Sequence, residues 1–285
     1  KQWETECKKV FGFTPGIIGS GKFEIDKPIT IGNIQSLYRK IPQIRQEFGT
    51  IILDEMHHVS SPTFSRIIDK NCARYKIGLT GTLQRKDGRH VVFRDYFGDN
   101  VYKPPKENFM MPKIDILKLP IRFMDGNSIP WANRVNELAY DSEYQNSIAM
   151  TASAYAAKGH KVLVVSDRVD FLKNCARLTG DTAVCVTGAI PHEERPDIIK
   201  QIFKDGTQSI FSEGISLDVL SCLVLGTPVN NEPLLTQLIG RIIRTYEGKK
   251  QPTVVDINLI GNTARRQAGQ RLGYYLKQGY DISTL

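Results

Sequence analysis

The chain has 285 residues, of which 41% are hydrophobic and 24% are charged. This balance excludes a disordered chain, a collagen and a small disulfide-bonded scaffold, and the length is enough for about two domains. The 38 lysines and arginines outnumber the 30 acidic residues, so the net charge is +8. A surplus of this size favours a polyanionic partner such as nucleic acid.

Short segments rich in Val, Ile and Leu alternate with helical patterns from one end of the chain to the other. Each carries polar residues at its C-terminal end, which is typical of buried parallel strands with functional groups at the carboxyl edge of a sheet. The predicted strands are 29–34, 50–55, 76–81, 161–166, 222–227 and 253–258. The predicted helices are 61–72, 143–159, 169–180 and 193–206.

Composition changes near the middle of the chain, where residues 103–113 contain three prolines and no helical period. We therefore predict a first α/β domain over residues 1–113, a linker strand over 114–130 and a second α/β domain over 131–285. The chain starts without Met at what looks like an amphipathic helix, so we expect further sequence upstream of Lys1.

The cysteines predict a reducing environment. Their number, five, is odd and they include no Cys-x-x-Cys pair, which argues against a disulfide framework or a zinc knuckle. No apolar run approaches the roughly 18 residues that a membrane-spanning helix needs. We therefore expect an intracellular protein that does not contact a membrane.

Two carboxylates, Asp54 and Glu55, lie at the end of the strongest predicted strand, residues 50–55. In a phosphoryl-transfer site one such carboxylate holds Mg²⁺, usually through water, and the other orients or deprotonates an attacking water. The structural alternative is an acidic turn that ends the strand and caps the helix at Ser60 and Ser61.

Gln237, Arg241 and Arg244 are spaced i, i+4 and i+7, so a helix would place them on one face. Two guanidinium groups and an amide on one face suit a polyphosphate and can stabilise charge on a transferring phosphoryl group. An exposed basic helix is the alternative, since the apolar neighbours would form a buried face in either case.

A stretch from Gly16 to Lys22 imitates a phosphate-binding P-loop, GxxxxGK[ST]. However, Phe23 follows where the Mg²⁺-binding hydroxyl is needed, and the next residues have a strand pattern rather than a helical one. We therefore predict a loop or a hairpin turn at this position.

The acidic pair and the arginine segment together resemble motifs II and VI of the superfamily 2 helicases and translocases. Asp54-Glu55-Met56-His57 resembles the DExH box, and residues 237–244 match QxxGRxxR, the most specific of the motifs. The resemblance extends over essentially the whole chain in the family's motif order. The other matching segments are 1–3 for motif Ia, 31–37 for Ib, 80–82 for III, 161–168 for IV and 212–216 for V.

Narrower branches of the family are indicated by two features. Arg85-Lys86-Asp87 is similar to the Arg-Glu-Asp motif of the XPB branch, and Ser216, where most relatives have Asp, resembles the phage branch-migration helicases of the UvsW kind. The resemblance implies an ATP-dependent DNA helicase or translocase, monomeric, that remodels forked or branched DNA in replication, recombination and repair. An RNA helicase and a non-catalytic nucleic-acid-binding scaffold remain as alternatives.

The resemblance also implies two RecA-like parallel-sheet domains in tandem, with ATP in a cleft between them. Asp54 would hold Mg²⁺ through water, Glu55 would activate the attacking water, and Gln237 would position it. Arg241 and Arg244 would neutralise the developing charge. The residues implied in ATP binding or in coupling it to DNA are His57, Thr80, Thr82, Gly214 and Ser216. The implied DNA contacts, independent of base sequence, are Gly32, Asn33, Gln35, Ser36, Arg85, Asp87, Ser166, Thr187, Gly188 and Ser212.

Besides Ser216, the chain departs from the family pattern at Asn33, where motif Ib usually has Thr, and in two longer segments. The family has a P-loop before motif Ia, which we expect upstream of Lys1. It also has a buried strand just before motif V, where residues 203–214 offer only a poor one, so we expect residues to be missing near 205–207.

Overall fold

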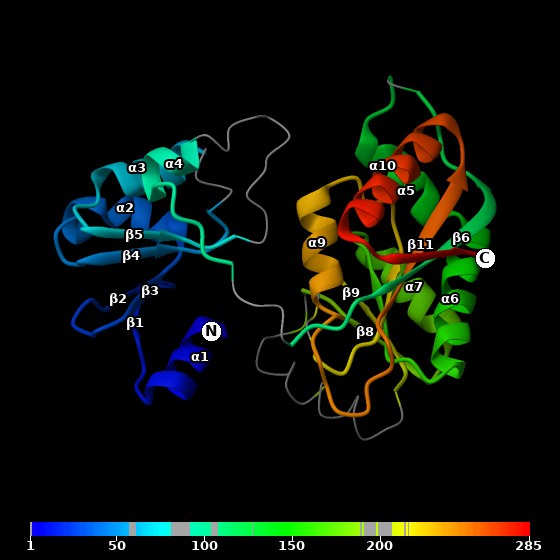
Figure 1. Ribbon diagram of the computed structural model, residues 1–285, viewed down its shortest axis with the longest axis horizontal. Helices are drawn as coiled ribbons and strands as arrows, with labels where there is room; N and C mark the ends of the chain where they lie inside the picture. Colours follow the sequence, from blue (N-terminus) through cyan, green and yellow to red (C-terminus); the bar gives the residue numbers. More distant parts are fainter. Residues whose placement is uncertain are drawn as a thin grey trace. The chain divides into compact units, whose positions relative to one another are not determined.

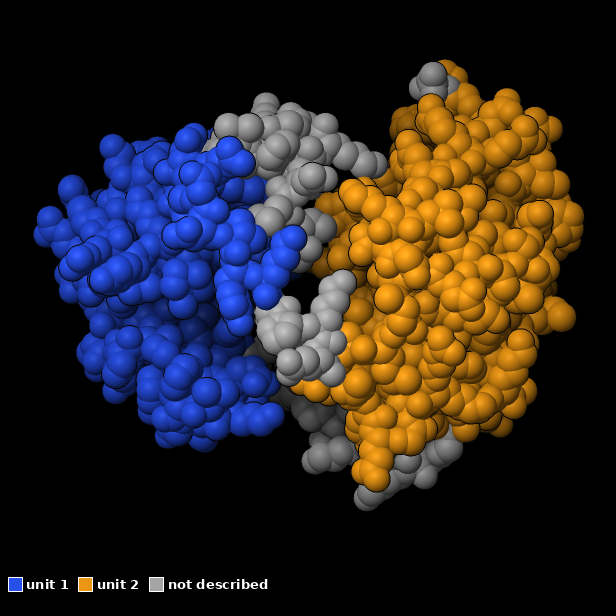
Figure 2. Space-filling view, viewed as in Figure 1, with its two compact units in different colours: residues 1–104 blue, residues 105–285 orange. Residues whose placement is uncertain are grey.

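The computed structural model describes residues 2–56, 61–80, 92–103, 108–126, 128–188, 190, 198, 207–213, 215 and 217–285. The chain forms two compact units, unit 1 with residues 1–104 and unit 2 with residues 105–285 (Figures 1 and 2). Both units combine helices with parallel strands, so the predicted α/β class is confirmed. None of the helices in the described ranges is both long and apolar enough to cross a membrane.

Unit 1 contains two small sheets. One has three strands in the order β2-β1-β3, and in the other β4 pairs in parallel with β5. Leu53, Met56, Ile68 and Phe93 form a buried cluster against the β4–β5 pair. The described elements are α1 (Gln2–Phe11), β1 (Gly16–Gly19), β2 (Lys22–Phe23), β3 (Thr30–Gly32), α2 (Ile34–Ile44), β4 (Thr50–Leu53), α3 (Pro62–Lys70), β5 (Tyr75–Gly78) and α4 (Val92–Phe97).

One face of the β4–β5 pair is open to solvent. Ile52, Tyr75 and Ile77 are 60%, 56% and 45% exposed. They share a face because Ile52 is paired with Ile77 and side chains alternate along each strand. The β4–β5 sheet is therefore covered on one side only within the described residues.

The stretch that imitates a P-loop is a β-hairpin, as predicted. β1 pairs antiparallel with β2, and the turn residues Ser20 and Gly21 have φ values of 52° and 81°. Two successive positive φ angles are typical of the tight turns that match the twist of a hairpin. Lys22 lies on the exposed strand β2 and pairs with Glu24 at 4.0 Å.

Unit 2 is a seven-stranded sheet with helices on both faces (Figure 1). All its strands are parallel, in the order β12-β6-β11-β10-β7-β9-β8. The described elements are β6 (Lys113–Arg122), α5 (Trp131–Tyr140), α6 (Ser142–Ala157), β7 (Val162–Val165), α7 (Val169–Thr179), β8 (Ala183–Val186), β9 (Ser209–Ser212), β10 (Cys222–Leu225), α9 (Glu232–Gly240), β11 (Thr253–Ile260), α10 (Asn262–Gln278) and β12 (Asp281–Thr284).

Burial explains why the strands of unit 2 are continuous apolar runs. In β7, Val162 and Val164 pack into a core with α5, α6 and α7, whereas Leu163 and Val165 pack into a second core with α9 and α10. Every residue of this strand is buried. A parallel strand covered on both faces needs apolar side chains on both, which is the pattern that predicted it.

Two predictions about unit 2 differ from the structure. The segment 114–130, predicted as a linker strand, contributes β6, which pairs with β11 and β12 inside the sheet. The segment 203–214, predicted to hold only a poor strand, contains β9, which lies between β7 and β8 and is completely buried. Ser209 and Ser212 at its ends weakened the apolar signal, yet they are only 0% and 4% exposed.

A buried ion pair ties the last helix to the sheet. Arg271 of α10 donates from Nε and Nη2 to the Asp256 carboxylate at 2.7–3.0 Å, and Tyr275 Oη donates to the same carboxylate at 2.9 Å. The two charged residues are 6% and 2% exposed. Burial lowers the pKa of Arg271, but the neighbouring Asp256 outweighs it, so the pKa lies above its usual value.

Candidate active site

The acidic pair lies at the carboxyl end of β4, as predicted. Asp54 is exposed and its Oδ1 accepts the Glu55 amide at 2.9 Å. Glu55 is half-buried and has a φ of 52°, a left-handed conformation that is uncommon outside glycine. Backbone strain of this kind persists only where surrounding contacts impose it, and it is frequent at functional sites.

Contacts with β5 impose this conformation. The amide of Met56 donates to the Leu79 carbonyl at 2.9 Å, and the amide of Leu79 donates to the Leu53 carbonyl at 2.8 Å. The Met56 side chain packs over Gly78, where an added Cβ would lie 2.1 Å from the Met56 sulfur. The backbone turns sharply at Glu55, and Met56 then bonds to Leu79 just after β5. This turn places the acidic pair beside the end of β5.

Thr80 follows β5 at the same edge as Asp54 and Glu55, because β4 and β5 are parallel and Leu79 is bonded on both sides. The structure therefore brings together three of the predicted residues of unit 1. His57, Thr82, Arg85 and Asp87 of the prediction lie outside the described residues, as do Gly214 and Ser216 of unit 2.

The predicted DNA contacts of unit 1 surround the start of α2. Asn33 is the N-cap residue, and its Oδ1 accepts the Ser36 amide at 2.9 Å. Gln35 is exposed, and Gly32 ends β3. An added Cβ on Gly32 would lie 2.5 Å from Leu37, so packing requires glycine there. The four predicted residues are thus neighbours, and Asn33 has a structural role that the sequence analysis did not assign.

The predicted DNA contacts of unit 2 lie at the carboxyl edge of its sheet. Ser166 follows β7, Thr187 and Gly188 follow β8, and Ser212 ends β9, which lies between them. The three hydroxyl residues are only 4–7% exposed. The exposed Gly188 amide donates to Glu213 Oε2 at 2.7 Å, a partner that the sequence analysis missed.

The arginine segment begins on α9 but leaves the helix earlier than predicted. The helix ends at Gly240, Arg241 is its C-cap, and Arg244 lies in an extended bridge with Phe109. Gln237, Arg241 and Arg244 therefore do not share one helical face, and this part of the prediction is wrong. The apolar neighbours Leu238, Ile239 and Ile242 are buried as expected.

The Arg241 guanidinium is the least satisfied polar group of this segment. Its Nη1 is buried and has no hydrogen-bond partner among the described residues. Burial lowers the pKa of Arg241 from its usual value. A buried unpaired donor is unfavourable, so it indicates a place for an anionic ligand.

Arg244 is exposed and is surrounded by two residues that the sequence analysis did not identify. Its Nη1 lies 3.3 Å from Asp218 Oδ1. Lys249 Nζ donates to the Asp218 carbonyl at 2.8 Å and to the Arg244 carbonyl at 2.7 Å. Lys249 is followed by Lys250, and nothing in the sequence distinguishes the two.

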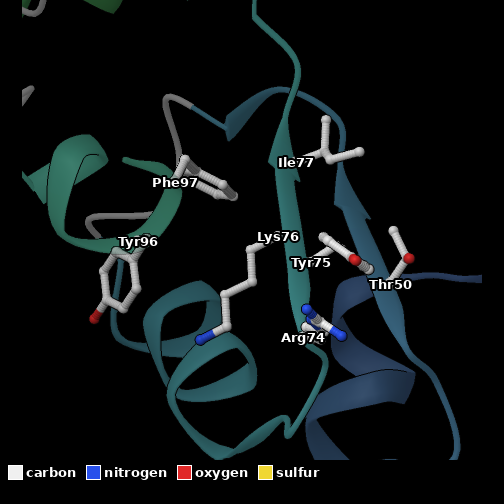
Figure 3. A pocket seen from close by; sticks show the side chains of 7 residues that line it. All are labelled: Thr50, Arg74, Tyr75, Lys76, Ile77, Tyr96 and Phe97. Atoms are coloured by element: carbon white, nitrogen blue, oxygen red, sulfur yellow. The ribbon is translucent and has the colours of Figure 1, made fainter. Parts of the chain in front are cut away.

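Unit 1 also has a groove of about 450 Å³, which lies away from its acidic pair. It runs along β5 beside α4 and is lined by side chains that include Thr50, Arg74 and Tyr96 (Figure 3). Thr50 starts β4, whereas Asp54 follows its other end. Lys76 extends toward α3, where its ammonium donates a hydrogen bond to the Ile68 carbonyl at 3.2 Å.

The chain matches two family models in the regions that carry these residues. One is described as the res subunit of type III restriction enzymes and covers residues 1–85, and the other is the helicase conserved C-terminal domain and covers residues 146–246. The fold is similar to that of S. cerevisiae Dbp5 bound to RNA and ADP BeF3, with a TM-score of 0.64 at 11% identity over 100% of this chain and 74% of the other. The fold is therefore that of RecA-like helicase domains.

One curated relative shows the family, and a second is more similar over a smaller share of its length. The chain is 34% identical to "DNA 3'-5' translocase XPB2" of Sulfurisphaera tokodaii, over 95% of this chain and 72% of that protein. It is 43% identical to "Probable helicase D10" of Escherichia phage T5, over 100% of this chain and 65% of that protein. The chain belongs to the superfamily 2 helicases. It spans about two thirds of the length of the phage relative, 65%.

Asp54 in unit 1 and Arg241 in unit 2, each taken by itself, carry groups whose chemistry suits a magnesium–nucleotide ligand. No cluster of three or more His, Cys, Asp or Glu that could hold a metal is found in the described ranges. Mg²⁺ usually binds through one or two carboxylates together with water and substrate phosphates, which an exposed Asp54 suits. The unpaired nitrogen of Arg241 suits a phosphate oxygen.

Proposed function

We propose that this chain is the motor region of an ATP-dependent DNA helicase or translocase that remodels forked or branched DNA. One observation carries the proposal: the chain combines an acidic pair on a strained turn with an arginine whose buried nitrogen has no partner among the described residues. Carboxylates that handle water and guanidiniums that neutralise charge are the two halves of a phosphoryl-transfer site.

In this mechanism, the acids and arginines act on the same triphosphate. Asp54 would hold Mg²⁺ through water, Glu55 would orient or deprotonate the attacking water, and Gln237 would position that water. Arg241 and Arg244 neutralise charge as it develops, an effect worth roughly 10³–10⁵ in rate in related chemistry. When bound, Mg²⁺ would supply positive charge that neutralises the triphosphate.

Hydrolysis requires groups from both units, so catalysis is coupled to their relative motion, and that motion is the motor stroke. Thr80 couples the nucleotide to the DNA-binding residues of unit 1. For His57, Thr82, Gly214 and Ser216, the same role rests on their motif positions alone.

We also propose that DNA is held by phosphate contacts that do not depend on base sequence. The exposed Gln35 and the α2 start support the contact in unit 1, and the exposed Gly188 supports the contact in unit 2. Arg85 and Asp87 act at the point of strand separation. The protein works as a monomer inside the cell, and its binding weakens with added salt because counterions are released.

DNA is favoured over RNA by the name of the 34%-identical relative, a DNA translocase. RNA remains the second candidate, because Dbp5, which shares the fold, was solved bound to RNA. The intact acids and arginines argue against a scaffold that has lost catalysis.

One assay separates the three candidates. ATP hydrolysis by the full-length gene product is measured with forked DNA, linear duplex, single strands and RNA, with Glu55→Gln as the control for contaminating ATPases. Turnover that depends on DNA and is largest on forks supports the proposal. Stimulation by RNA alone supports the RNA helicase, and no turnover with any nucleic acid supports the scaffold.

A further inference from the structure

The main chain around Arg244 is held more firmly than its side chain. The amide of Met110 donates to the Ile243 carbonyl at 2.7 Å, and the amide of Thr245 donates to the Asn108 carbonyl at 3.1 Å. The chain just after the boundary between the units thus pairs with the arginine segment. Lys249 Nζ adds an independent bond, at 2.7 Å, to the Arg244 carbonyl.

The Arg244 guanidinium, by contrast, has one weak partner in the part of the chain that the structure describes. It lies 3.3 Å from Asp218, and the two side chains are 57% and 52% exposed. Ion pairs this exposed contribute little to stability. The guanidinium can therefore leave Asp218 while the backbone that carries it stays in place.

Lys249 differs from an ordinary surface lysine. It is half-buried and bridges two carbonyls from separate connections, that of Asp218 between β9 and β10 and that of Arg244 between α9 and β11. Burial lowers the pKa of Lys249 to about 8; Asp218 opposes this effect and Arg244 adds to it. Among the described residues, Asp218 and Arg244 are the charged groups that affect its ammonium.

We propose that Lys249 is a positioning residue, which fixes the Arg244 main chain to the β9–β10 connection through the Asp218 carbonyl. The Asp218 carboxylate holds the Arg244 guanidinium until a triphosphate replaces it. The inference rests on the proposed ATPase function. Lys249 itself does not contact the nucleotide. It fixes the backbone of Arg244 and so limits the positions that the Arg244 guanidinium can occupy.

The first test is Lys249→Met in the full-length gene product, with Lys250→Met as the matched control. Lys250 is the adjacent lysine, and its Nζ also donates to a carbonyl, that of Lys158, away from Arg244. Without nucleotide, Lys249→Met should speed hydrogen exchange at the Thr245 amide, and Lys250→Met should not. In turnover, Lys249→Met should lower kcat roughly 10–100-fold with little change in the KM for ATP, since a misplaced catalytic group costs about that much.

The second test uses pH and the conservative variant. Wild-type kcat should fall above pH 8 as Lys249 loses its proton and its charge-assisted bonds weaken. Lys249→Arg keeps its charge at every accessible pH, so it should restore turnover relative to Lys249→Met and remain active through pH 9. If the kcat of Lys249→Arg falls above pH 8 as it does in the wild type, the loss of activity is not caused by deprotonation of Lys249.

The third test concerns Asp218. Asp218→Asn removes the weak hold on the guanidinium, so a non-hydrolysable ATP analogue should bind up to about fivefold more tightly. Weaker binding overturns this half of the inference. Unchanged exchange at Thr245 in Lys249→Met overturns the other half. If the wild type hydrolyses no ATP, the proposed function fails, while the exchange comparison still decides whether Lys249 fixes the arginine segment.

Discussion

The two units hold their functional groups in different ways. In unit 1, Asp54 and Glu55 lie on a short turn whose shape is set by local contacts with β5, beside a sheet that is open on one face. In unit 2, the arginine segment is set by residues far away in the sequence, beside a sheet buried on both faces. A substitution near the acidic pair should therefore disturb only its immediate surroundings in unit 1. A substitution in the core of unit 2 should lower the stability of the whole unit.

The largest expected effect on stability is in unit 2, at the buried pair of Arg271 and Asp256. Arg271→Met should lower the free energy of unfolding by about 3–5 kcal/mol, because it leaves an unpaired carboxylate in the core. Denaturant unfolding followed by circular dichroism measures the loss. Arg265→Met, an exposed position on the same helix, is the control, with an expected change within about 0.5 kcal/mol. Equal effects of the two variants would contradict the account.

A smaller effect is expected in unit 1 at Gly78. Gly78→Ala places a Cβ 2.1 Å from the Met56 sulfur, which must move together with the turn that carries Glu55. Overpacking of this kind costs about 1–3 kcal/mol. ATP turnover should fall as well, because the acidic turn shifts. Gly49→Ala is the control, since nothing lies within 4 Å of its added Cβ. Full turnover in Gly78→Ala would show that the turn does not depend on this packing.

The smallest effect is expected at the cap of α2. Asn33→Ala removes the acceptor of the Ser36 amide and should lower the free energy of unfolding by about 1 kcal/mol. Gln43→Ala, at an exposed position in the same helix, should leave stability nearly unchanged. The two variants are compared by thermal unfolding. A loss at Gln43 that equals the loss at Asn33 would remove the cap as the explanation.

The sequence predicts the strands of unit 2 well where their apolar runs are long enough. β7, β10 and β11 fall within a few residues of their predicted ranges, because two-sided burial leaves a direct trace in composition. The sequence indicates only a poor strand at β9 because just Ile210 and Phe211 are apolar, while the flanking serines are polar and are buried by the neighbouring strands. The pairing of β6 within the sheet is a long-range property that no local pattern records.

The site is predicted in part for the same reason. The position of Asp54 and Glu55 after β4 follows from the strand and its end, which are local features. The end of α9 at Gly240 does not follow, because the apolar period continues through Ile243. There the chain leaves the helix to pair with residues 108–110, more than a hundred residues earlier in the sequence. Asp218 and Lys249 were missed because they reach Arg244 only through this arrangement.

The central claim is that groups from both units act on one triphosphate. Its most direct test is single-turnover ATP hydrolysis by Glu55→Gln, Arg241→Ala and the double variant of the full-length gene product. Groups that serve one chemical step lose their contributions together, so the double variant should be about as slow as the slower single variant. If the two rate losses multiply, the acid and the arginine act independently and the claim is contradicted.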